Sequence, residues 1–436
     1  MIEQLPEAFL QYIWKTKLFY THQLFTTQKI PITLLNIGIH NHQTGPDFLH
    51  AKIKIGEALW MGHVEIHRKA SDWLAHQHQH DENYDLVILH VVYENDIEIK
   101  RTNHTPIPTL CLKGKIPKNV IQNYWRLYNN QHWIPCQEQI LSDRVTQFRY
   151  QAWLDRLVVE RLEYKTHSIQ QSLNENKNDW EQSFYKSLAR SLGAKVNANA
   201  FERLADSLPL KILQKHSDQL CQLEALLLGQ AGLLDKNFKE EYPKKLQKEY
   251  RHLQKKYKLQ KLLSTSWQFG KIRPAAYPTI RMAQLALLLQ QEKGLFSKII
   301  NCKTIKQFQE LFKVQLLGYW KTHYRLDECS KERSKSLGRA CLQTILINSI
   351  VPFLFVYGKR MDDESYKDLA LKLLESIPSE KNSILNRWNQ LGFSAPSAYT
   401  SQALLELKNS YCNQKRCTEC AIGNRLIRKK ISLVRS

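Results

Sequence analysis

The stretch GPDFLHAKIKIGEALWMGHVEIH, residues 45–67, decides the fold of the N-terminal part of this chain. Apolar and polar residues alternate from Phe48 to Ile55, Gly56 and Glu57 follow, and a second run begins at Ala58. Alternation with a period of two is typical of strands, and a glycine-containing pair between two such runs is typical of a turn. The sequence therefore predicts a β-hairpin.

Two acidic residues frame this hairpin. Asp47 opens its first strand and Glu65 lies near the end of its second, so the two carboxylates are expected to meet at one end of the sheet. Carboxylates at close range repel each other unless a cation lies between them, and hard oxygen ligands favour Mg²⁺ or Mn²⁺. We therefore expect a divalent metal at Asp47 and Glu65, with the Ile66 carbonyl as a further ligand.

The flanking segments add four elements to the hairpin. A helix is expected from Pro6-Glu7, a strand over 30–38, a short helix from Ser71 and a strand over 85–93. The last run is rich in β-branched residues, which is typical of a buried central strand. The predicted order is helix, three strands, helix and strand.

Pro46-Asp47 and the later triplet 65–67, placed in this order of elements, resemble the PD-(D/E)XK nuclease superfamily over roughly residues 1–115. The resemblance implies an α+β fold with an αβββαβ restriction-endonuclease-like core. It also implies that Asp47 and Glu65 are catalytic acids. Glu7, on the first helix, then matches the extra acidic residue that many members carry there.

His67 departs from the superfamily pattern, because it stands where most members have lysine. It shares a strand face with Glu65, and an unperturbed imidazole suits either a metal ligand or a general base at neutral pH. Lys69 or Lys52 could instead supply the missing amine.

The whole chain also resembles a bacterial family catalogued as a domain of unknown function. The segments that carry this resemblance are GPDF at 45–48, VEIH at 64–67, SDW at 71–73, VILHVVY at 87–93, RP at 273–274, PTIR at 278–281 and the cysteine-rich tail. This resemblance implies no activity and supports a domain plan. The plan has a nuclease-like core over 1–118, a connector over 119–142, a helical basic domain over 143–405 and a cysteine-rich tail over 406–436.

Composition indicates a soluble globular protein of two or three domains, since 43% of the 436 residues are apolar and 24% are charged. No segment approaches the roughly 20 uncharged apolar residues of a membrane span. The most apolar stretch, 345–357, is expected to be a buried helix. The N-terminus has no secretory pattern, so we expect a cytoplasmic protein with no membrane partner, whose nine cysteines are thiols or metal ligands.

The net charge of +22 is distributed unevenly. Residues 1–115 hold 11 Lys/Arg, 12 Asp/Glu and 11 of the 16 histidines, so the excess of positive charge lies in the remainder. We expect the chemistry in the first part and attraction for polyanions in the second. A solubility effect or a ribosome-associated protein is the alternative.

After Pro117 the apolar residues recur at helical spacing. The expected helices cover 145–164, 180–192, 220–228, 243–263, 278–291, 305–318, 338–355 and 364–375.

The stretch 243–263 is the clearest candidate for contact with a nucleic-acid backbone. Its expected apolar stripe is Leu246, Tyr250, Leu253 and Tyr257, and its basic residues are Lys244, Lys245, Lys248, Arg251, Lys255, Lys256, Lys258 and Lys261. Like charges at these spacings repel, and a bound polyanion would relieve the repulsion. A solvated helix face is the alternative. Arg273 and Arg281, around the start of the next expected helix, could contact phosphate or lie in a buried ion pair.

Cys412, Cys417 and Cys420 follow a C-x4-C-x2-C pattern, which suits Zn²⁺ or an iron–sulfur cluster. Neighbouring Lys415 and Arg416 are expected to lower the thiol pKa values. Some PD-(D/E)XK nucleases carry a four-cysteine iron–sulfur cluster, usually with different spacing. The candidates for a fourth ligand are Cys302, Cys329, Cys341 and His323, and buried thiols without metal are the alternative.

His76, His78 and His80 form an H-x-H-x-H pattern. If the segment is helical, His76 and His80 share one face, as zinc ligands sometimes do, whereas polar surface is the alternative. His90 lies within an apolar strand and is expected to be a hydrogen-bonded core residue or to point to the metal.

The sequence therefore predicts metal-dependent hydrolysis of phosphodiester bonds in nucleic acid, in DNA rather than RNA, with His67 or Lys69 assisting the two acids. A catalytically inactive nucleic-acid-binding or assembly protein of the same fold is the alternative, and His67 favours it. A metal-dependent hydrolase with another substrate is a third interpretation.

Overall fold

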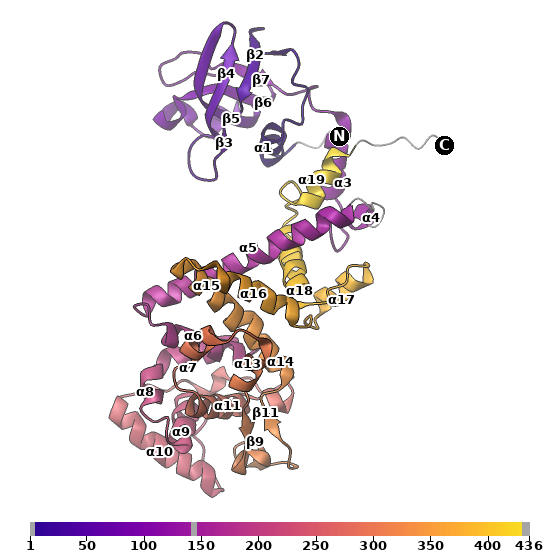
Figure 1. Cartoon of the computed structure of the whole chain (residues 1–436). Coiled ribbons are helices and arrows are strands. Elements are labelled where there is room, and N and C mark those ends of the chain that lie inside the picture. Colours follow the sequence, from indigo (N-terminus) through magenta and orange to yellow (C-terminus); the bar gives the residue numbers. More distant parts are fainter. Residues whose placement is uncertain (1–4, 141–145, 430–436) are drawn as a thin grey trace. The chain divides into compact units, whose positions relative to one another are not determined.

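The structure is a computed structural model that describes residues 5–140 and 146–429. The chain forms two compact units (Figure 1). Unit 1 comprises residues 1–153 together with 407–436, and unit 2 comprises residues 154–406. Unit 1 holds the larger sheet and unit 2 is mostly helical, so the expected α+β class is confirmed.

Unit 1 is built around a mixed sheet. Its elements are α1 (Glu7–Lys15), β1 (Leu24–Phe25), β2 (Pro31–Asn36), β3 (Ile39–His40), β4 (Phe48–Ile55), β5 (Ala58–Lys69), α2 (Asp72–Ala75), β6 (Val87–Glu94), β7 (Thr109–Cys111), α3 (Lys118–Tyr128), α4 (Gln137–Ile140) and α19 (Ala421–Arg428). The strands follow the order β1-β2-β4-β5-β6-β7, and β3 pairs with β4. The β4–β5 pair is antiparallel, whereas β5–β6 and β6–β7 are parallel.

The predicted hairpin is confirmed as β4 and β5, which turn at Gly56 with φ of 60°. The predicted central strand is β6, in which every residue from Val87 to Val92 is buried. α1 buries Phe9, Ile13 and Trp14 on one face, since these residues recur at helical spacing. Removing this apolar area from water stabilises the position of α1 in unit 1.

The tail folds with the N-terminal part of the chain. α19 packs against α3 (Figure 1), and Asn123 donates a hydrogen bond from Nδ2 to the carbonyl of Ile427 at 3.2 Å. The segments that the domain plan named connector and tail thus contribute to unit 1.

Among the described residues, unit 2 is a helical assembly with two short two-stranded sheets, β8–β11 and β9–β10. Its helices are α6 (Trp180–Leu192), α7 (Ala198–Ser207), α8 (Leu210–Gln214), α9 (Leu220–Gln230), α10 (Glu241–Tyr257), α11 (Pro278–Gln291), α12 (Leu295–Asn301), α13 (Ile305–Leu311), α14 (Arg339–Ile345), α15 (Val351–Met361), α16 (Glu364–Ser376), α17 (Ser383–Gln390) and α18 (Ala398–Glu406). The chain enters it through α5 (Thr146–Glu175), and its strands are β8 (Gln315–Leu316), β9 (His323–Arg325), β10 (Glu328–Cys329) and β11 (Lys335–Ser336). The expected helices over 180–192 and 278–291 are confirmed to the residue.

Two expected helices end earlier than predicted. α10 stops at Tyr257 because Lys258 adopts a left-handed conformation with φ of 52°, so the expected extent to residue 263 is wrong. α13 stops at Leu311, and the following chain forms β8, which pairs with β11. Local periodicity does not reveal such tertiary strand pairing.

Two helical runs are longer than expected. α5 continues to Glu175, beyond the expected end at residue 164, and residue 145 lies outside the described part of the chain. Residues 339–361 form a continuous helix through a π-helical turn over 346–350, and its length and composition would allow it to cross a membrane. Of its most apolar window, 72% is buried inside the protein, as in the core helix expected over 345–357.

The packing of α9 on α10 gives a stability test. A Cβ added at Gly229 would lie 2.1 Å from the ring of Tyr250. Gly229→Ala is therefore expected to destabilise the protein by about 1–3 kcal/mol, because the ring must move within a packed core. Urea unfolding measures this loss. Gly270→Ala is the control, since its added Cβ meets no atom within 4 Å among the described residues. An unchanged midpoint for the Gly229 variant would contradict this packing.

Candidate metal centre

The hairpin brings Asp47 and Glu65 together through the backbone. The Asp47 N–H donates to Glu65 Oε2 at 3.0 Å, and the Ile66 N–H donates to Asp47 Oδ2 at 3.1 Å. Asp47 precedes β4 and Glu65 lies in β5, so the antiparallel pairing of these strands sets both carboxylates. Ile66 contributes its N–H to the site. The role of its carbonyl as a further metal ligand stays a prediction.

α1 adds two more side chains. Glu7 lies in its first turn, and Gln11 follows one turn later on the same face. Gln11 donates from Nε2 to Asp47 Oδ1 at 2.8 Å. Sequence reasoning missed Gln11, although its spacing of four residues from Glu7 was a usable signal.

The three carboxylates raise one another's pKa values. Burial raises the pKa of Glu65 to about 8, and the charge of Glu7 adds to the rise. Burial and the charge of Glu65 raise the pKa of Asp47 to about 7. The pKa of Glu7 is likewise raised to about 7, by burial and by Asp47. No Lys or Arg of the described ranges forms an ion pair with any of these acids. The acids are therefore short of positive charge.

Three histidines converge on the same carboxylates. The ring nitrogens of His67, His76 and His78 lie within 4.8 Å of one another. Glu65 Oε1 lies 3.5 Å from Nε2 of both His67 and His78. Imidazole and carboxylate donors in one place suit a transition-metal ion such as Mn²⁺. We call the six residues Glu7, Asp47, Glu65, His67, His76 and His78 the acid–histidine centre.

His67 is oriented by a second buried ring. Its Nδ1 lies 2.8 Å from Nε2 of His90, and its Nε2 lies 3.1 Å from Nδ1 of His76. Because His90 engages Nδ1, the His67 nitrogen that faces Glu65 and His76 is Nε2, and this is the atom placed to ligate a metal. His90 is thus a hydrogen-bonded core residue that positions His67, which confirms the first of the two expectations for it.

The pKa of His67 bears on its expected role as a base. Burial and the three neighbouring histidines lower this pKa to about 2, so the ring is neutral at ordinary pH. The idea that an unperturbed pKa suits His67 to proton transfer is therefore wrong, because the ring is fully buried. A neutral imidazole fits the role of metal ligand.

Lys69 lies at the end of β5, where its charge acts on Glu94 and Asp96. These two acids are distinct from the acid–histidine centre. Lys52 is exposed on β4. The amine that the superfamily pattern requires thus has no equivalent among the described contacts of the centre.

The histidine pairing differs from the helical expectation. α2 ends at Ala75 and Gln77 adopts a left-handed conformation with φ of 61°, so His76 and His80 do not share a helix face. His78 instead turns inward and stacks on Tyr84 with ring centroids 3.7 Å apart. Sequence reasoning missed Tyr84, whose pKa is raised by burial and by the charges of the carboxylates.

The residues of the acid–histidine centre differ in solvent exposure. Glu65 and His67 are buried, Glu7 and Asp47 are partly exposed, and His76 is exposed. The centre therefore reaches the protein surface at His76.

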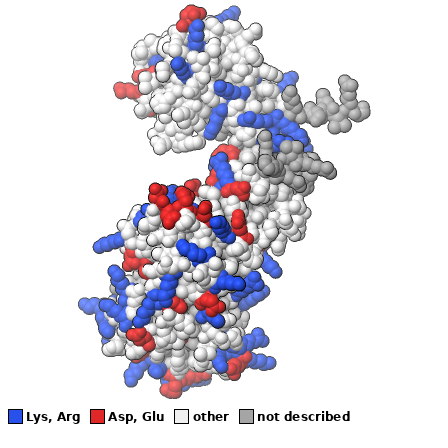
Figure 2. All heavy atoms as spheres, in the orientation of Figure 1, with Lys and Arg blue, Asp and Glu red and all other residues white. Residues whose placement is uncertain are grey.

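The basic residues expected to contact nucleic acid lie in unit 2. α10 buries Pro243, Leu246, Tyr250 and Leu253, while Tyr257 is only partly buried. The basic residues on its other faces are exposed: Lys244, Lys245, Lys248, Arg251, Lys255 and Lys256. Figure 2 shows Lys and Arg side chains spread over the visible face of unit 2.

The two arginines near α11 differ in exposure. Arg273 is exposed just before the short helical turn at Pro274. Arg281 is partly buried and donates from Nη1 to Gln284 Oε1 at 2.8 Å. Arg281 is therefore held by an amide within unit 2 rather than in the buried ion pair that was the alternative.

The tail cysteines have raised thiol pKa values. Burial raises the pKa of Cys412, Cys417 and Cys420, so the expected lowering by neighbouring cations is wrong. Lys415 does favour the Cys417 thiolate, but burial outweighs it. Arg416 donates to Glu419 Oε1 at 3.1 Å.

The residues suggested as a fourth ligand beside the three tail cysteines all belong to unit 2, whereas the tail cysteines belong to unit 1. His323 is engaged there, with Nε2 3.0 Å from Glu240 Oε1. Cys302, Cys329 and Cys341 likewise lie in that unit.

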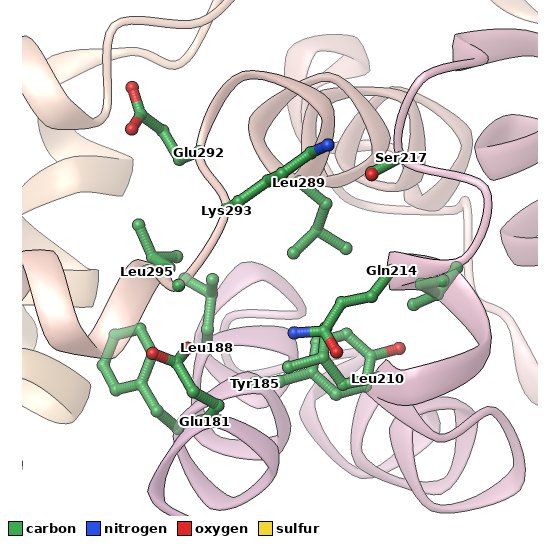
Figure 3. Close-up of a pocket in the computed structure, with 13 residues that line it drawn as sticks. Glu181, Tyr185, Leu188, Leu210, Gln214, Ser217, Leu289, Glu292, Lys293 and Leu295 are labelled. Carbon is green, nitrogen blue, oxygen red and sulfur yellow. The ribbon is translucent and has the colours of Figure 1, made fainter.

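A cavity of about 170 Å³ lies in unit 2 between α6, α8 and the start of α12 (Figure 3). Its walls are mainly apolar, and its charged residues are already paired. Glu181 accepts hydrogen bonds from the N–H groups of Phe296 and Ser297, Lys293 pairs with Asp218, and Glu292 pairs with Lys298. Unlike the acid–histidine centre, this cavity has no unpaired charge to offer a substrate.

The fold and this centre together define a two-unit α+β protein with a partly buried carboxylate–histidine site. A model of the family described as "Protein of unknown function (DUF2851)" matches residues 7–383, and the chain belongs to this family. No curated protein and no solved structure matches the chain. The expected membership of an uncharacterised family is thus confirmed.

Proposed function

We propose that this protein is a metal-dependent phosphodiesterase that cleaves nucleic acid, DNA in preference to RNA, and that unit 1 has a PD-(D/E)XK-like core. The observation that carries the proposal is the convergence of Glu7, Asp47 and Glu65, with raised pKa values and no Lys or Arg partner among the described residues. The order of α1, β2, β4, β5, α2 and β6 supports it.

The residues of the centre fit a divalent metal. Asp47 and Glu65 would hold the ion, His67 and His78 would complete its coordination, and His90 would orient His67. A bound ion would lower the pKa of a water molecule and neutralise charge that builds on the phosphate. Gln11 and the Ile66 N–H hold the Asp47 carboxylate in place, which limits the reorganisation needed on binding.

The ligand set favours Mn²⁺ over Mg²⁺, because Mg²⁺ prefers oxygen donors whereas Mn²⁺ also accepts imidazole. His78→Ala is expected to weaken Mn²⁺ binding by roughly 10-fold or more and to leave Mg²⁺ binding less affected. Calorimetric titration with each ion measures both effects. His80→Ala is the matched control, because His80 is the exposed neighbour in the same histidine pattern. An equal loss of Mn²⁺ affinity in the two variants would contradict a role for His78 as a metal ligand.

Unit 2 would supply affinity for the polyanion. Its surplus of lysine and arginine, including the exposed residues of α10, favours contact with phosphates regardless of base sequence. Arg273 is exposed and could add a phosphate contact. We place the protein in the cytoplasm as part of this proposal.

The test is a cleavage assay on the full chain with labelled single- and double-stranded DNA and RNA, with Mn²⁺, Mg²⁺ or chelator. Expected is cleavage that needs the metal, is fastest with Mn²⁺, and prefers DNA. Cleavage that persists in chelator, or none on any substrate with either metal, contradicts the proposal.

The second candidate is a nucleic-acid-binding or assembly protein without catalysis. The observation that favours it is the missing lysine, since His67 occupies that position and the charge of Lys69 acts on other acids. Salt-dependent binding of DNA without cleavage under any metal condition would support this candidate instead.

A further inference from the structure

Unit 1 contains a second group of potential metal ligands, separate from the acid–histidine centre. It consists of the three tail cysteines and one cysteine that directly precedes α4, namely Cys136, Cys412, Cys417 and Cys420. We call this group the cysteine quartet. All four residues belong to unit 1, although the chain that joins Cys136 to Cys412 runs through the whole of unit 2.

Hydrogen bonds from Lys408 and Lys415 to carbonyls of the segment before Cys136 bring the two parts of the quartet near each other, and each thiol affects the pKa values of its partners. The charges of Cys417 and Cys420 act on Cys136, and those of all three partners act on Cys412. Cys420 also acts on Cys417, so every pair within the quartet interacts. Cys136 and Cys420 are buried, while Cys412 and Cys417 are partly exposed.

The backbone around Cys417 and Cys420 forms a tight turn. A Cβ added at Gly423 would lie 2.2 Å from the carbonyl oxygen of Cys417, so only glycine permits this approach. Cys420 precedes α19, and the N–H groups of Ile422 and Gly423 form hydrogen bonds to its sulfur. Such N–H donors stabilise a thiolate, as in metal–sulfur sites.

Two lysine side chains lie near the quartet cysteines of the tail. Lys408 favours the thiolate of Cys412, and Lys415 favours that of Cys417. Both lysines also join the tail to the segment before Cys136. Lys408 donates to the carbonyl of Trp133 at 2.6 Å, and Lys415 donates to that of Tyr128 at 2.5 Å. The two lysine side chains, through these backbone carbonyls, thus hold the two segments together beside the quartet.

We infer that the cysteine quartet binds one thiolate-ligated metal centre, either Zn²⁺ or an iron–sulfur cluster, and that Cys136 supplies the fourth ligand. Four cysteines are a complete set for both kinds of centre. Four thiolates gathered in one place repel one another without a cation, and metal binding would release the protons that the thiols carry. The centre would join segments that are 275 residues apart in sequence at Trp133 and Lys408.

This inference is independent of the proposed function, because its readout is metal content. Protein purified without oxygen is analysed for zinc, iron and acid-labile sulfide. Expected is either about one Zn²⁺ per chain without visible colour, or iron and sulfide in equal amounts with broad visible absorbance. The same analysis of Glu65→Gln excludes metal bound at the acid–histidine centre, and its quartet metal is expected to stay at the wild-type level.

Single serine variants identify the ligands. Cys136→Ser is expected to lose most of the metal, as is Cys420→Ser, whereas Cys302→Ser keeps the wild-type content. Cys302 is the matched control, because it is a partly buried cysteine of unit 2 that was itself a candidate ligand. Full metal content in the Cys136 variant, or loss in the Cys302 variant, overturns the assignment.

Thiol alkylation of the folded wild-type protein tests the same assignment without a variant, so it applies even where a serine variant does not fold. Mass spectrometry is expected to find the quartet unmodified until a chelator removes the metal, and alkylated afterwards. Wild-type protein without zinc or iron, whose quartet thiols react at once or form disulfides, contradicts the inference.

Discussion

Asp47→Asn is expected to abolish Mn²⁺-dependent cleavage and, at the same time, to stabilise the metal-free protein. The loss of cleavage should reach about 100-fold or more, because a ligand that holds the ion contributes several kcal/mol to the transition state. Glu65→Gln is expected to behave in the same way. A purely structural role for these acids would predict the opposite effect on stability, since a structural acid contributes to the fold.

The sign of the stability change follows from the pKa values. Asp47 and Glu65 have pKa values near 7 and 8 in the folded protein, above the ordinary values of 3.8 and 4.5. Between these limits the folded state binds more protons than the unfolded chain, so the metal-free protein loses stability as the pH rises. His67 and His90 act in the opposite direction below pH 6.5, because their folded pKa values are lowered to about 2 and about 3.

The clearest window is therefore about pH 7–8, above the ordinary histidine pKa of 6.5, where the histidines are mostly neutral in both states. In this window the metal-free wild type should lose thermal stability as the pH rises, and Mn²⁺ should restore it. Asp47→Asn removes the charge and should raise the melting temperature at pH 8 by roughly 2–4 °C, which corresponds to about 1 kcal/mol in a domain of this size.

Thermal scans at about pH 7 and pH 8, with and without Mn²⁺, measure these effects beside the cleavage assay. Glu57→Gln is the matched control, because Glu57 lies in the turn of the same hairpin and its side chain is 97% exposed. This variant should match the wild type in every measurement. If Asp47→Asn cleaves normally, or melts lower than the wild type in chelator at pH 8, the acid–histidine centre is not a metal site.

The second large effect is expected on α10. Reversing the exposed charges of Lys248, Arg251 and Lys255 should weaken DNA binding by the full chain about 100-fold or more at low salt. The slope of log K against log salt should also fall by roughly 0.9 for each phosphate contact that is lost. The fold should survive, because the face that α10 buries consists of Pro243, Leu246, Tyr250 and Leu253.

Fluorescence anisotropy with labelled DNA over a range of salt concentrations measures both quantities. The control is the triple reversal of Lys211, Lys372 and Lys381, which are exposed elsewhere in unit 2 and give the same net charge. A control that loses as much affinity as the α10 variant would mean that overall charge, and not this helix, attracts DNA. Unchanged affinity and slope in the α10 variant would leave α10 as a solvated surface.

Local patterns in the sequence were sufficient for much of the fold. The alternation before Gly56 and after it predicted β4 and β5, and the apolar spacing predicted α6 and α11 to the residue. Such patterns succeed because a side chain's face depends only on the period of its own element. They failed at α10 and α13, where a left-handed residue and a distant strand partner ended the helices.

The sequence by itself determined the hairpin, β6 and several of the helices, and it indicated that Asp47 and Glu65 would meet, because adjacent antiparallel strands bring their ends together. Only the tertiary structure decided that Gln11 holds Asp47, that His78 and not His80 turns toward Glu65, and that Cys136 joins the tail cysteines. It also decided the protonation of the centre, since burial raises the carboxylate pKa values and lowers that of His67. Burial depends on contacts between segments far apart in the chain, and no local pattern contains that information.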